Sequence, residues 1–107
     1  MYGPMPEGHW ASGRAGNPDT YNGLRRGRQY QVAQAFRDFD GDDHPVGETW
    51  VFLGHNYVPY HDGLSLFVSL DGRQEWQIRM SCAPEDQGSI VGALDRYVVP
   101  VVSLSKG

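Results

Sequence analysis

The stretch that decides the fold reads Asp38-Phe39-Asp40-Gly41-Asp42-Asp43-His44-Pro45-Val46-Gly47-Glu48-Thr49-Trp50-Val51-Phe52-Leu53. Its first half is rich in Asp, Gly and Pro, which is the chemistry of turns whose carboxylates accept hydrogen bonds from nearby backbone N–H groups. Its second half, Glu48 to Leu53, is apolar on both parities, as is typical of a strand covered on both faces. The stretch therefore predicts an acidic loop that leads into the central strand of a β domain.

Three other segments show the two-residue period of half-buried strands. Residues 28–36 place Tyr30, Val32 and Phe36 on one side, and residues 64–70 and 74–80 each gather large apolar side chains on one face. Residues 54–63 instead mix Gly, Asn, Pro and Asp with aromatic residues. That composition predicts a loop that exposes its rings.

The turn between the last two strands follows from parity. A two-residue Asp71-Gly72 loop would place apolar residues opposite charged ones, because a one-residue slip turns every side chain to the other face. A three-residue loop of Leu70, Asp71 and a left-handed Gly72 instead pairs Leu66 with Trp76. We therefore expect a hairpin with the three-residue loop.

The C-terminal part predicts one helix over about residues 84–99. Pro84 suits the first helical position, and Pro100 ends the helix. One apolar stripe runs along this segment and must pack on the sheet or on a partner. Residues 98–102 leave an apolar tail that is either a short edge strand or a contact surface.

The length and the pattern together predict one domain that is mainly β. A chain of 107 residues is long enough for one hydrophobic core. We expect an α+β fold, a small SH3-like barrel or a strongly bent antiparallel sheet, over residues 24–99 with the helix at its end. Residues 1–23 form a Gly/Pro-rich N-terminal arm, expected as a loose tail unless its aromatic residues dock on a partner or on the domain, and residues 100–107 form a short apolar tail.

Charge and cysteine content exclude several classes of protein. A formal net charge of −4 gives no overall basic footprint for nucleic acid. Cys82 is the single cysteine, so no intramolecular disulfide can form. The first residues have neither a basic start nor an apolar run, so we expect no signal peptide, and no apolar run reaches membrane-spanning length. We therefore expect a soluble, cytoplasmic protein that binds neither nucleic acid nor membrane.

Four motifs carry a family resemblance: Asp-x-Asp-Gly in the acidic loop, the run from His44 to Gly54, the run from Asp62 to Gly72, and Glu75-Trp76-Gln77-Ile78-Arg79. Together they resemble an uncharacterised family of small bacterial proteins, known only as a domain of unknown function. The resemblance extends from about Leu24 to Val98. The family carries no established activity or catalytic residue, so the resemblance implies nothing about function.

The acidic loop is a candidate cation site, since clustered carboxylates are the ligands that calcium takes. Its carboxylates come from Asp38, Asp40, Asp42 and Asp43, with His44 beside them. An EF-hand loop needs Gly at its sixth position and Glu at its twelfth, whereas Gly41 is fourth and Glu48 is eleventh here. The spacing therefore favours a solvated turn without metal.

Histidines and the cysteine are the other candidates for chemistry. His44, His55 and His61 could gather at one end of the domain to hold zinc or supply a base, although their spacing matches no standard site and favours surface histidines. Cys82 precedes the expected helix start, a position that can lower the pKa of a thiol, but a structural cysteine is favoured. Three arginines, Arg25, Arg26 and Arg28, could touch phosphate weakly and are better explained as partners of the acidic loop or as solvated side chains.

The favoured hypothesis is a noncatalytic binding module for a protein partner or for self-association, without cofactor, metal or catalytic residue. Loop aromatics supply contact area at little cost in entropy. One alternative is a small metal- or thiol-dependent enzyme that uses the loop histidines or Cys82, and another is a structural subunit whose arm and tail order in an assembly. The candidate binding residues are Tyr57, Tyr60, His55, His61, Asp40, Asp42 and His44.

Overall fold

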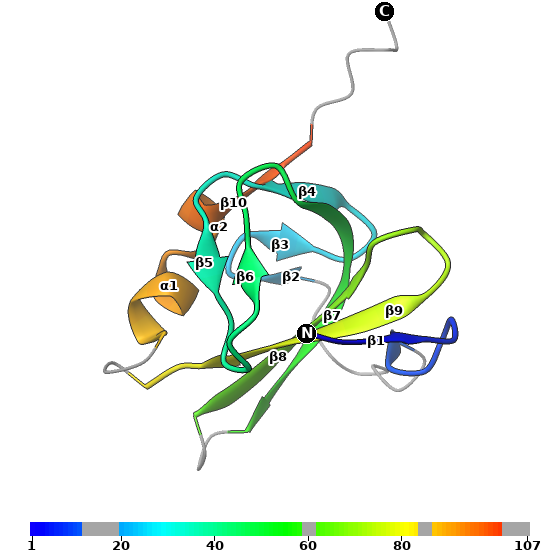
Figure 1. Ribbon diagram of the computed structural model, residues 1–107, viewed down its shortest axis with the longest axis horizontal. Helices are drawn as coiled ribbons and strands as arrows, with labels where there is room; N and C mark the ends of the chain where they lie inside the picture. Colours follow the sequence, from blue (N-terminus) through cyan, green and yellow to red (C-terminus); the bar gives the residue numbers. More distant parts are fainter. Residues whose placement is uncertain (12–19, 59–61, 84–86, 102–107) are drawn as a thin grey trace, which may run out of the picture.

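A six-stranded antiparallel sheet forms the body of the computed structural model, which describes residues 1–11, 20–58, 62–83 and 87–101. The strands follow the order β1-β9-β8-β7-β4-β10. Their bounds are β1 Tyr2–Met5, β4 Gln29–Val32, β7 Thr49–Val58, β8 Gly63–Ser69, β9 Glu75–Ser81 and β10 Val98–Pro100. Two small ribbons, β2 Thr20–Tyr21 with β3 Leu24–Arg25 and β5 Phe36–Arg37 with β6 Asp43–His44, lie against the sheet with the helices α1 Gly88–Gly92 and α2 Leu94–Tyr97 (Figure 1).

The sheet is strongly bent, and its bend is concentrated in β7. The pairing of β7 with β8 shifts by one residue between Phe52 and Gly54, which places a bulge at Leu53. A bulge increases local twist and lets one long strand serve two neighbours, here β4 through residues 49–51 and β8 through residues 51–58. The mainly β fold and the bent antiparallel sheet are confirmed. The sheet stays open, because the edge strands β1 and β10 do not pair with each other in the described part of the chain.

The expected loop at residues 54–63 is in large part a strand. Residues 54–58 continue β7 and pair with β8, so that His55 lies opposite Leu66 and Tyr57 opposite Leu64. Pairing with the apolar β8 outweighs the loop-like composition of this segment, as tertiary contacts commonly do for strands.

The hairpin of β8 and β9 has the predicted facing but a different register. Leu66 pairs with Ile78 rather than Trp76, so the connection is residues 70–74 and not three residues. Gly72 is left-handed as predicted, with φ of 80°. The longer loop is held by Asp71 Oδ1, which accepts the backbone N–H groups of Arg73 and Gln74, each at 2.8 Å. Side-chain hydrogen bonds to the backbone therefore set the loop length.

The core lies on the concave side of the bent sheet. Apolar side chains from the strands meet Val91 of α1 and Leu94 of α2 there. Each of the largest is at most 1% exposed, which removes most of the apolar surface of these strands from water. These fully buried aromatic and aliphatic side chains are Trp50, Tyr30, Phe52, Leu24, Leu64, Leu66, Ile78, Leu94, Val32, Val68 and Val98.

The prediction of one C-terminal helix is wrong for residues 87–99. Helix α1 ends at Gly92, and Ala93 leaves helical geometry with φ of −123° and ψ of 32°. Val98 is extended and pairs with Val32 as the first residue of β10. Gly92 favours the break, and β-branched Val98 and Val99 favour the strand. Of the two expectations for the apolar tail, the edge strand is confirmed for Val98–Pro100.

The expected loose tail is wrong for residues 2–11. Strand β1 pairs antiparallel with β9, with Tyr2 opposite Gln77 and Met5 opposite Glu75. In Figure 1, β1 lies alongside β9 at the edge of the sheet. The arm therefore docks on the surface of the domain itself.

Candidate functional site

The outward face of β8 and β9 carries polar side chains. Ser65 and Phe67 alternate with the core residues of β8, and Gln77 and Arg79 do the same on β9. Gln77 Nε2 donates a hydrogen bond to Ser65 Oγ at 2.8 Å. Such alternation fixes which side chains a partner on this face can meet.

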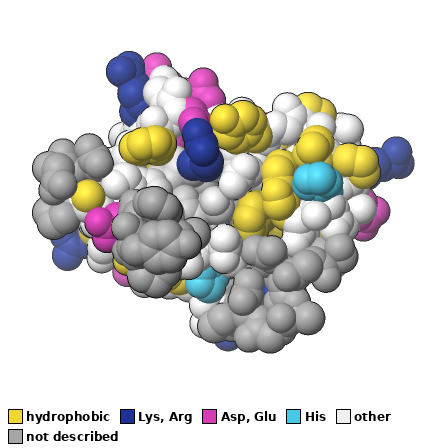
Figure 2. Space-filling view, turned by 90° about the horizontal axis from the view of Figure 1, so that it is seen from below, with side chains coloured by type: hydrophobic (Ala, Val, Ile, Leu, Met, Phe, Trp, Pro, Cys, Tyr) yellow, Lys and Arg dark blue, Asp and Glu magenta, His cyan; other side chains and the backbone are white. Residues whose placement is uncertain are grey.

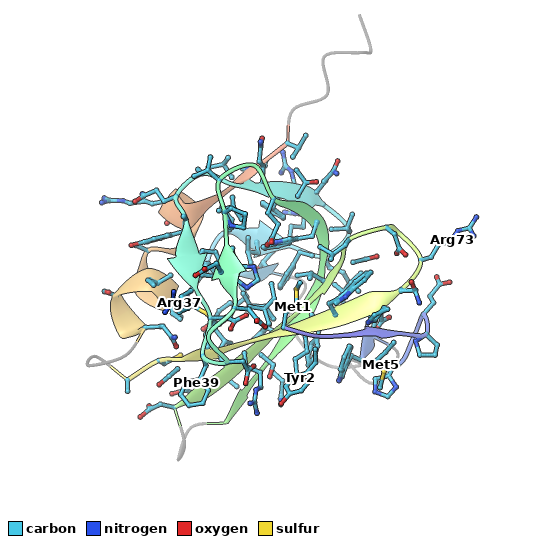
Figure 3. All side chains as sticks on the ribbon, viewed as in Figure 1. Met1, Tyr2, Met5, Arg37, Phe39 and Arg73 are labelled. Atoms are coloured by element: carbon cyan, nitrogen blue, oxygen red, sulfur yellow. The ribbon has the colours of Figure 1, made fainter. Side chains whose placement is uncertain are left out.

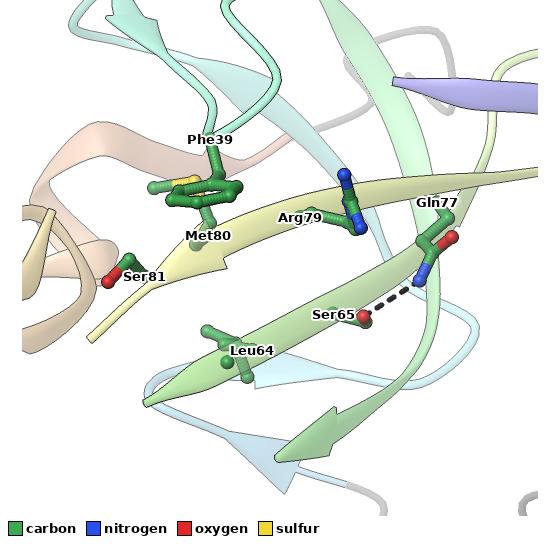
Figure 4. A pocket seen from close by; sticks show the side chains of 8 residues that line it. Phe39, Leu64, Ser65, Gln77, Arg79, Met80 and Ser81 are labelled. Carbon is green, nitrogen blue, oxygen red and sulfur yellow. Dashed lines mark hydrogen bonds between the residues drawn. The ribbon is translucent and has the colours of Figure 1, made fainter. Parts of the chain in front are cut away.

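A hollow of about 460 Å³ lies on this face, between β8, β9 and the acidic turn of residues 38–43. Its lining includes Phe39, Ser65, Gln77 and Arg79, which we call the outer groove (Figure 4). A second hollow of about 410 Å³ lies between β1 and β9 and shares Gln77 and Arg79 with the first. The two hollows thus meet at Arg79.

Arg79 is held from three sides. Its Nε donates to Asp40 Oδ2 at 3.0 Å, and its Nη2 also contacts Asp40 Oδ1. Its Cζ lies 5.0 Å from the ring centroid of Tyr2 and 6.0 Å from that of Phe39, within cation–π range. The hydrogen bond from Arg79 lowers the pKa of Asp40 below its ordinary value. The ion pair therefore stays formed in neutral solution.

The aromatic rings beside Arg79 are open to solvent. Tyr2 is 51% exposed and Phe39 is 56% exposed, although both are large apolar side chains. Figure 3 shows Phe39, Tyr2 and Met5 along the same side of the sheet. In the space-filling view, hydrophobic side chains lie beside basic and acidic ones on the face seen from below (Figure 2).

Phe39 is placed over β9 by the acidic turn. Its backbone N–H donates to Arg79 O at 2.8 Å, which ties the turn to the edge of β9. Asp38 Oδ1 accepts the N–H groups of Asp40 and Asp42, each at 3.0 Å. The predicted carboxylate-stabilised turn is confirmed, and it fixes the rim of the outer groove.

A buried histidine clamps this turn from below. His44 is 1% exposed, and its Nε2 lies 2.8 Å from Asp38 Oδ2 while its Nδ1 lies 2.6 Å from Glu48 Oε2. Glu48 Oε2 also accepts a hydrogen bond from Trp50 Nε1 at 3.1 Å. The Phe36 ring stacks on the imidazole at 4.8 Å. One imidazole therefore joins two carboxylates under the turn.

The hydrogen bonds of the clamp favour the charged forms of His44 and Asp38. Burial by itself lowers the pKa of His44, but the hydrogen bonds to Glu48 and Asp38 outweigh burial and raise that pKa above 6.5. Burial likewise raises the pKa of Asp38, yet the bond with His44, the N–H of Asp42 and the α-amino group of Met1 bring it below 3.8. The two carboxylates therefore favour the protonated form of the His44 ring.

The acidic loop is thus occupied by protein groups. Its carboxylates pair with Arg37, Arg79, His44 and the α-amino group of Met1. Of the two explanations for Arg25, Arg26 and Arg28, pairing with this loop is not seen in the described residues. There, no three His, Cys, Asp or Glu side chains come together in a way that could hold a metal ion.

The predicted binding residues do not form one group. His44 is buried in the clamp, so its expected place on the surface is wrong. His55 lies on β7 with its ring stacked on Tyr21 at 4.2 Å, and Tyr57, two residues on, is 43% exposed. Tyr60 and His61 lie outside the described residues. Asp40 borders the outer groove, and Asp42 contacts the α-amino group of Met1.

Cys82 does not resemble an activated thiol. It is half-buried just after β9, and burial, with the charge of Asp62, raises the pKa of its thiol. A raised pKa reduces the thiolate population at neutral pH. The raised pKa argues against the reactive-thiol alternative, and the favoured interpretation of Cys82 as a half-buried structural cysteine agrees with its burial.

The arm is anchored at Glu75, which is only 2% exposed. Glu75 Oε2 accepts the N–H of Gly8 at 2.6 Å, and Oε1 accepts those of Trp10 at 2.7 Å and Ala11 at 3.0 Å. Trp10 stacks on Phe67 at 5.5 Å. The sequence carried one signal for this surface: Glu75, Gln77 and Arg79 put polar side chains on the outward parity of a strand.

The fold and this face define a small, open β domain whose signature residues build a turn, a clamp and a groove. The chain belongs to the family described as "Domain of unknown function (DUF3601)", whose model matches residues 15–101. The recognised resemblance is therefore confirmed, and the matched segment begins earlier than expected.

A solved structure from the mobile metagenome of Vibrio cholerae, integron cassette protein VCH_CASS4, is similar to this chain. The two are 38% identical, with a TM-score of 0.76 over 82% of this chain and 97% of the other. A search of curated proteins found no match. None of the described helices is long and apolar enough to cross a membrane.

Proposed function

We propose that the protein is a noncatalytic binding module that takes a peptide segment of a protein partner in the outer groove. The observation that carries this proposal is the pair of exposed rings beside Arg79: Phe39 lines the hollow of about 460 Å³, and Tyr2 lines the neighbouring hollow of about 410 Å³. Exposed aromatic groups and arginine are the residues that contribute most to protein interfaces.

The groove is also well ordered before any partner arrives. The ion pair with Asp40 restricts the side chain of Arg79, and the bond from Phe39 N–H to Arg79 O fixes the backbone of the turn, so that less entropy is lost on binding. Ser65 and Gln77 add hydrogen-bonding groups to the floor of the groove. The partner we expect therefore combines an apolar or aromatic side chain with a polar backbone.

Charge and cysteine content support the rest of the proposal. The formal charge of −4 and the paired arginine of the groove favour a protein partner or a second copy over nucleic acid. Cys82 is a single free cysteine, so the chain carries no disulfide of its own, which is consistent with the reducing cytoplasm.

Peptide display against the immobilised full chain tests the groove. We expect enriched peptides to bind Phe39→Ala about tenfold more weakly than the unmodified chain, because the substitution removes one wall of the groove. Val46→Ala is the matched control, since Val46 is 65% exposed but does not line the groove. Enriched peptides that bind Phe39→Ala and Val46→Ala equally well would refute the proposed groove.

A further inference from the structure

The docked arm, residues 2–11, meets a surface of β8 and β9 that we call the arm seat: Phe67, Glu75, Trp76 and Gln77. The arm first adds a strand to β9 through Tyr2 and Met5. Gly3 then packs so closely that a Cβ there would lie 2.7 Å from both Glu75 O and Trp76 Cδ1. The arm and the seat therefore pack closely at Gly3, with no room for a larger side chain.

Glu75 makes the seat specific for a peptide backbone. A carboxylate that is only 2% exposed requires hydrogen bonds, because burying it without a partner is strongly unfavourable. Three backbone N–H groups of the arm, those of Gly8, Trp10 and Ala11, meet this requirement at 2.6 to 3.0 Å. Backbone N–H groups of a turn that converge on one point are a typical anion-binding arrangement, and here the N–H of His9 is left out because it donates to Pro6 O at 3.0 Å.

An aromatic contact completes the seat. Phe67 points outward from β8 but is 3% exposed, and the Trp10 ring stacks on it with an interplanar angle of 21°. Hollows of about 410 Å³ and 330 Å³ border the arm, the second lined by Glu7, Gly8, Ala11 and Glu75. The arm thus leaves part of the face unfilled on both flanks.

The arm seat lies inside the segment that the family model matches, and the docked arm lies outside it. All four seat residues lie within residues 15–101, the segment that the family model matches, whereas the docked arm precedes it. The arm covers three features of the matched segment: the carboxylate of Glu75, the outward ring of Phe67 and the edge of β9. These three features call for a peptide to cover them.

We propose that the arm seat is a peptide-binding site that this chain keeps occupied with its own arm. Its ligand is an extended peptide that adds antiparallel to β9, presents turn N–H groups to Glu75 and stacks an aromatic ring on Phe67. This mode is strand addition to a sheet edge, in which main-chain bonds supply affinity and side-chain contacts supply specificity. The inference rests on the proposed peptide-binding role and names its ligand class and its competitor.

The arm blocks the seat because it is tethered. A segment joined by a short linker acts at an effective concentration in the millimolar range, so a free peptide of equal intrinsic affinity competes poorly. Loosening the arm without touching the seat should therefore open the site. Gly3 and Trp10 belong to the arm alone, and both contact the seat.

The test uses the full chain with Gly3→Ala and Trp10→Ala together, titrated against a fluorescein-labelled peptide of residues 1–11 and followed by fluorescence anisotropy. We expect this arm-released chain to bind the peptide at least about tenfold more tightly than the unmodified chain, because the tethered competitor is lost. Glu75→Gln added to the arm-released chain should abolish the gain. Phe39→Ala added instead should leave it, since Phe39 belongs to the outer groove.

Circular dichroism and thermal unfolding confirm that each variant is folded, and Trp10→Ala alone serves if the double variant is not. A folded arm-released chain that binds the peptide no more tightly than the unmodified chain overturns the inference, and so does binding that survives Glu75→Gln. Peptide binding here without display enrichment at the groove would refute the groove alone. Enrichment there with no gain here would refute the arm seat alone.

Discussion

At the scale of single residues, the His44 clamp explains why the acidic turn keeps its shape. Asp38 is 2% exposed and would repel Glu48 if no positive charge lay between them. The imidazolium of His44 supplies that charge and donates to both carboxylates. Removing one member of such a buried set leaves uncompensated charge, which costs more than the pair itself contributes.

The clamp predicts a pH dependence of stability. His44 has a folded-state pKa above its ordinary 6.5, so its stabilisation is complete below pH 6.5 and is lost as the pH rises through the folded value. Asp38 has a folded-state pKa below 3.8, so its stabilisation is lost as the pH falls through that value. Urea unfolding between about pH 6 and pH 8 should therefore show the free energy of unfolding decreasing with pH.

His44→Gln is expected to lower the free energy of unfolding by about 2 to 4 kcal/mol near pH 6 and to flatten the dependence on pH. Arg37→Gln is the control, because the ion pair of Arg37 with Asp43 is exposed and should contribute less than about 1 kcal/mol. A pH dependence that is unchanged in His44→Gln would contradict the assignment.

Residue-level reasoning predicted the turn but not the clamp. Asp, Gly and Pro have local backbone preferences, so the turn at residues 38–43 was visible in the sequence. The partners of His44 are brought by the pairing of β5 with β6 and by the approach to β7, which no local pattern encodes. Glu48 at i+4 was the one local hint.

At the scale of elements, we expect alanine substitutions at two glycines of α1 to have opposite effects on stability. A Cβ at Gly88 would lie 2.7 Å from Cys82 O and 3.0 Å from Ala83 O, whereas a Cβ at Gly92 would meet nothing within 4 Å. We expect Gly88→Ala to lower the free energy of unfolding by about 1 to 3 kcal/mol through overpacking. Gly92→Ala should raise it by up to about 1 kcal/mol because alanine favours helix. Thermal unfolding of the two variants, compared with the unmodified chain, measures both effects. Destabilisation by both substitutions would contradict the open surroundings of Gly92.

Strands could be predicted from the sequence where one of their faces is apolar. They could not be predicted where pairing with a strand far away in the sequence determines the secondary structure. The facing of β8 against β9 followed from parity, but the register depended on side-chain bonds within the loop at Asp71. The end of β7 and all of β10 are strands because β8 and β4 lie beside them. The apolar stripe of residues 90–98 has a helical period, but the segment forms two short helices and a strand instead of one helix. Gly92 favours the break between the helices, and Val98 and Val99 favour the strand.

At the scale of the whole molecule, the arm and the central hairpin should differ in local stability. Leu66 and Val68 of β8 are fully buried and lie between two neighbouring strands, whereas β1 is exposed over most of its length and pairs on one side only. Hydrogen exchange by mass spectrometry should show at least about tenfold faster exchange in β1 than in β8. Gly3→Ala should remove the protection of β1 alone, and equal exchange of both strands would mean one cooperative unit.

The bent sheet could be predicted from the sequence, but the docking of the arm on β9 could not. Alternating apolar segments and turn residues were enough to infer a bent antiparallel sheet. The arm has no periodicity, and its place on β9 depends on Glu75 and Phe67, more than fifty residues away. Such contacts leave no trace in local composition.

The outer edge of β9 has a consequence for behaviour at high concentration. Three separate segments cover it in turn: β1 at Gln77, the N–H of Phe39 at Arg79, and the Gln87 N–H at Ser81. At the opposite edge, β10 has only three residues and ends in a proline. Because unpaired strand edges template aggregation, the covered β9 and the blunted β10 together guard the protein against fibre-like self-assembly.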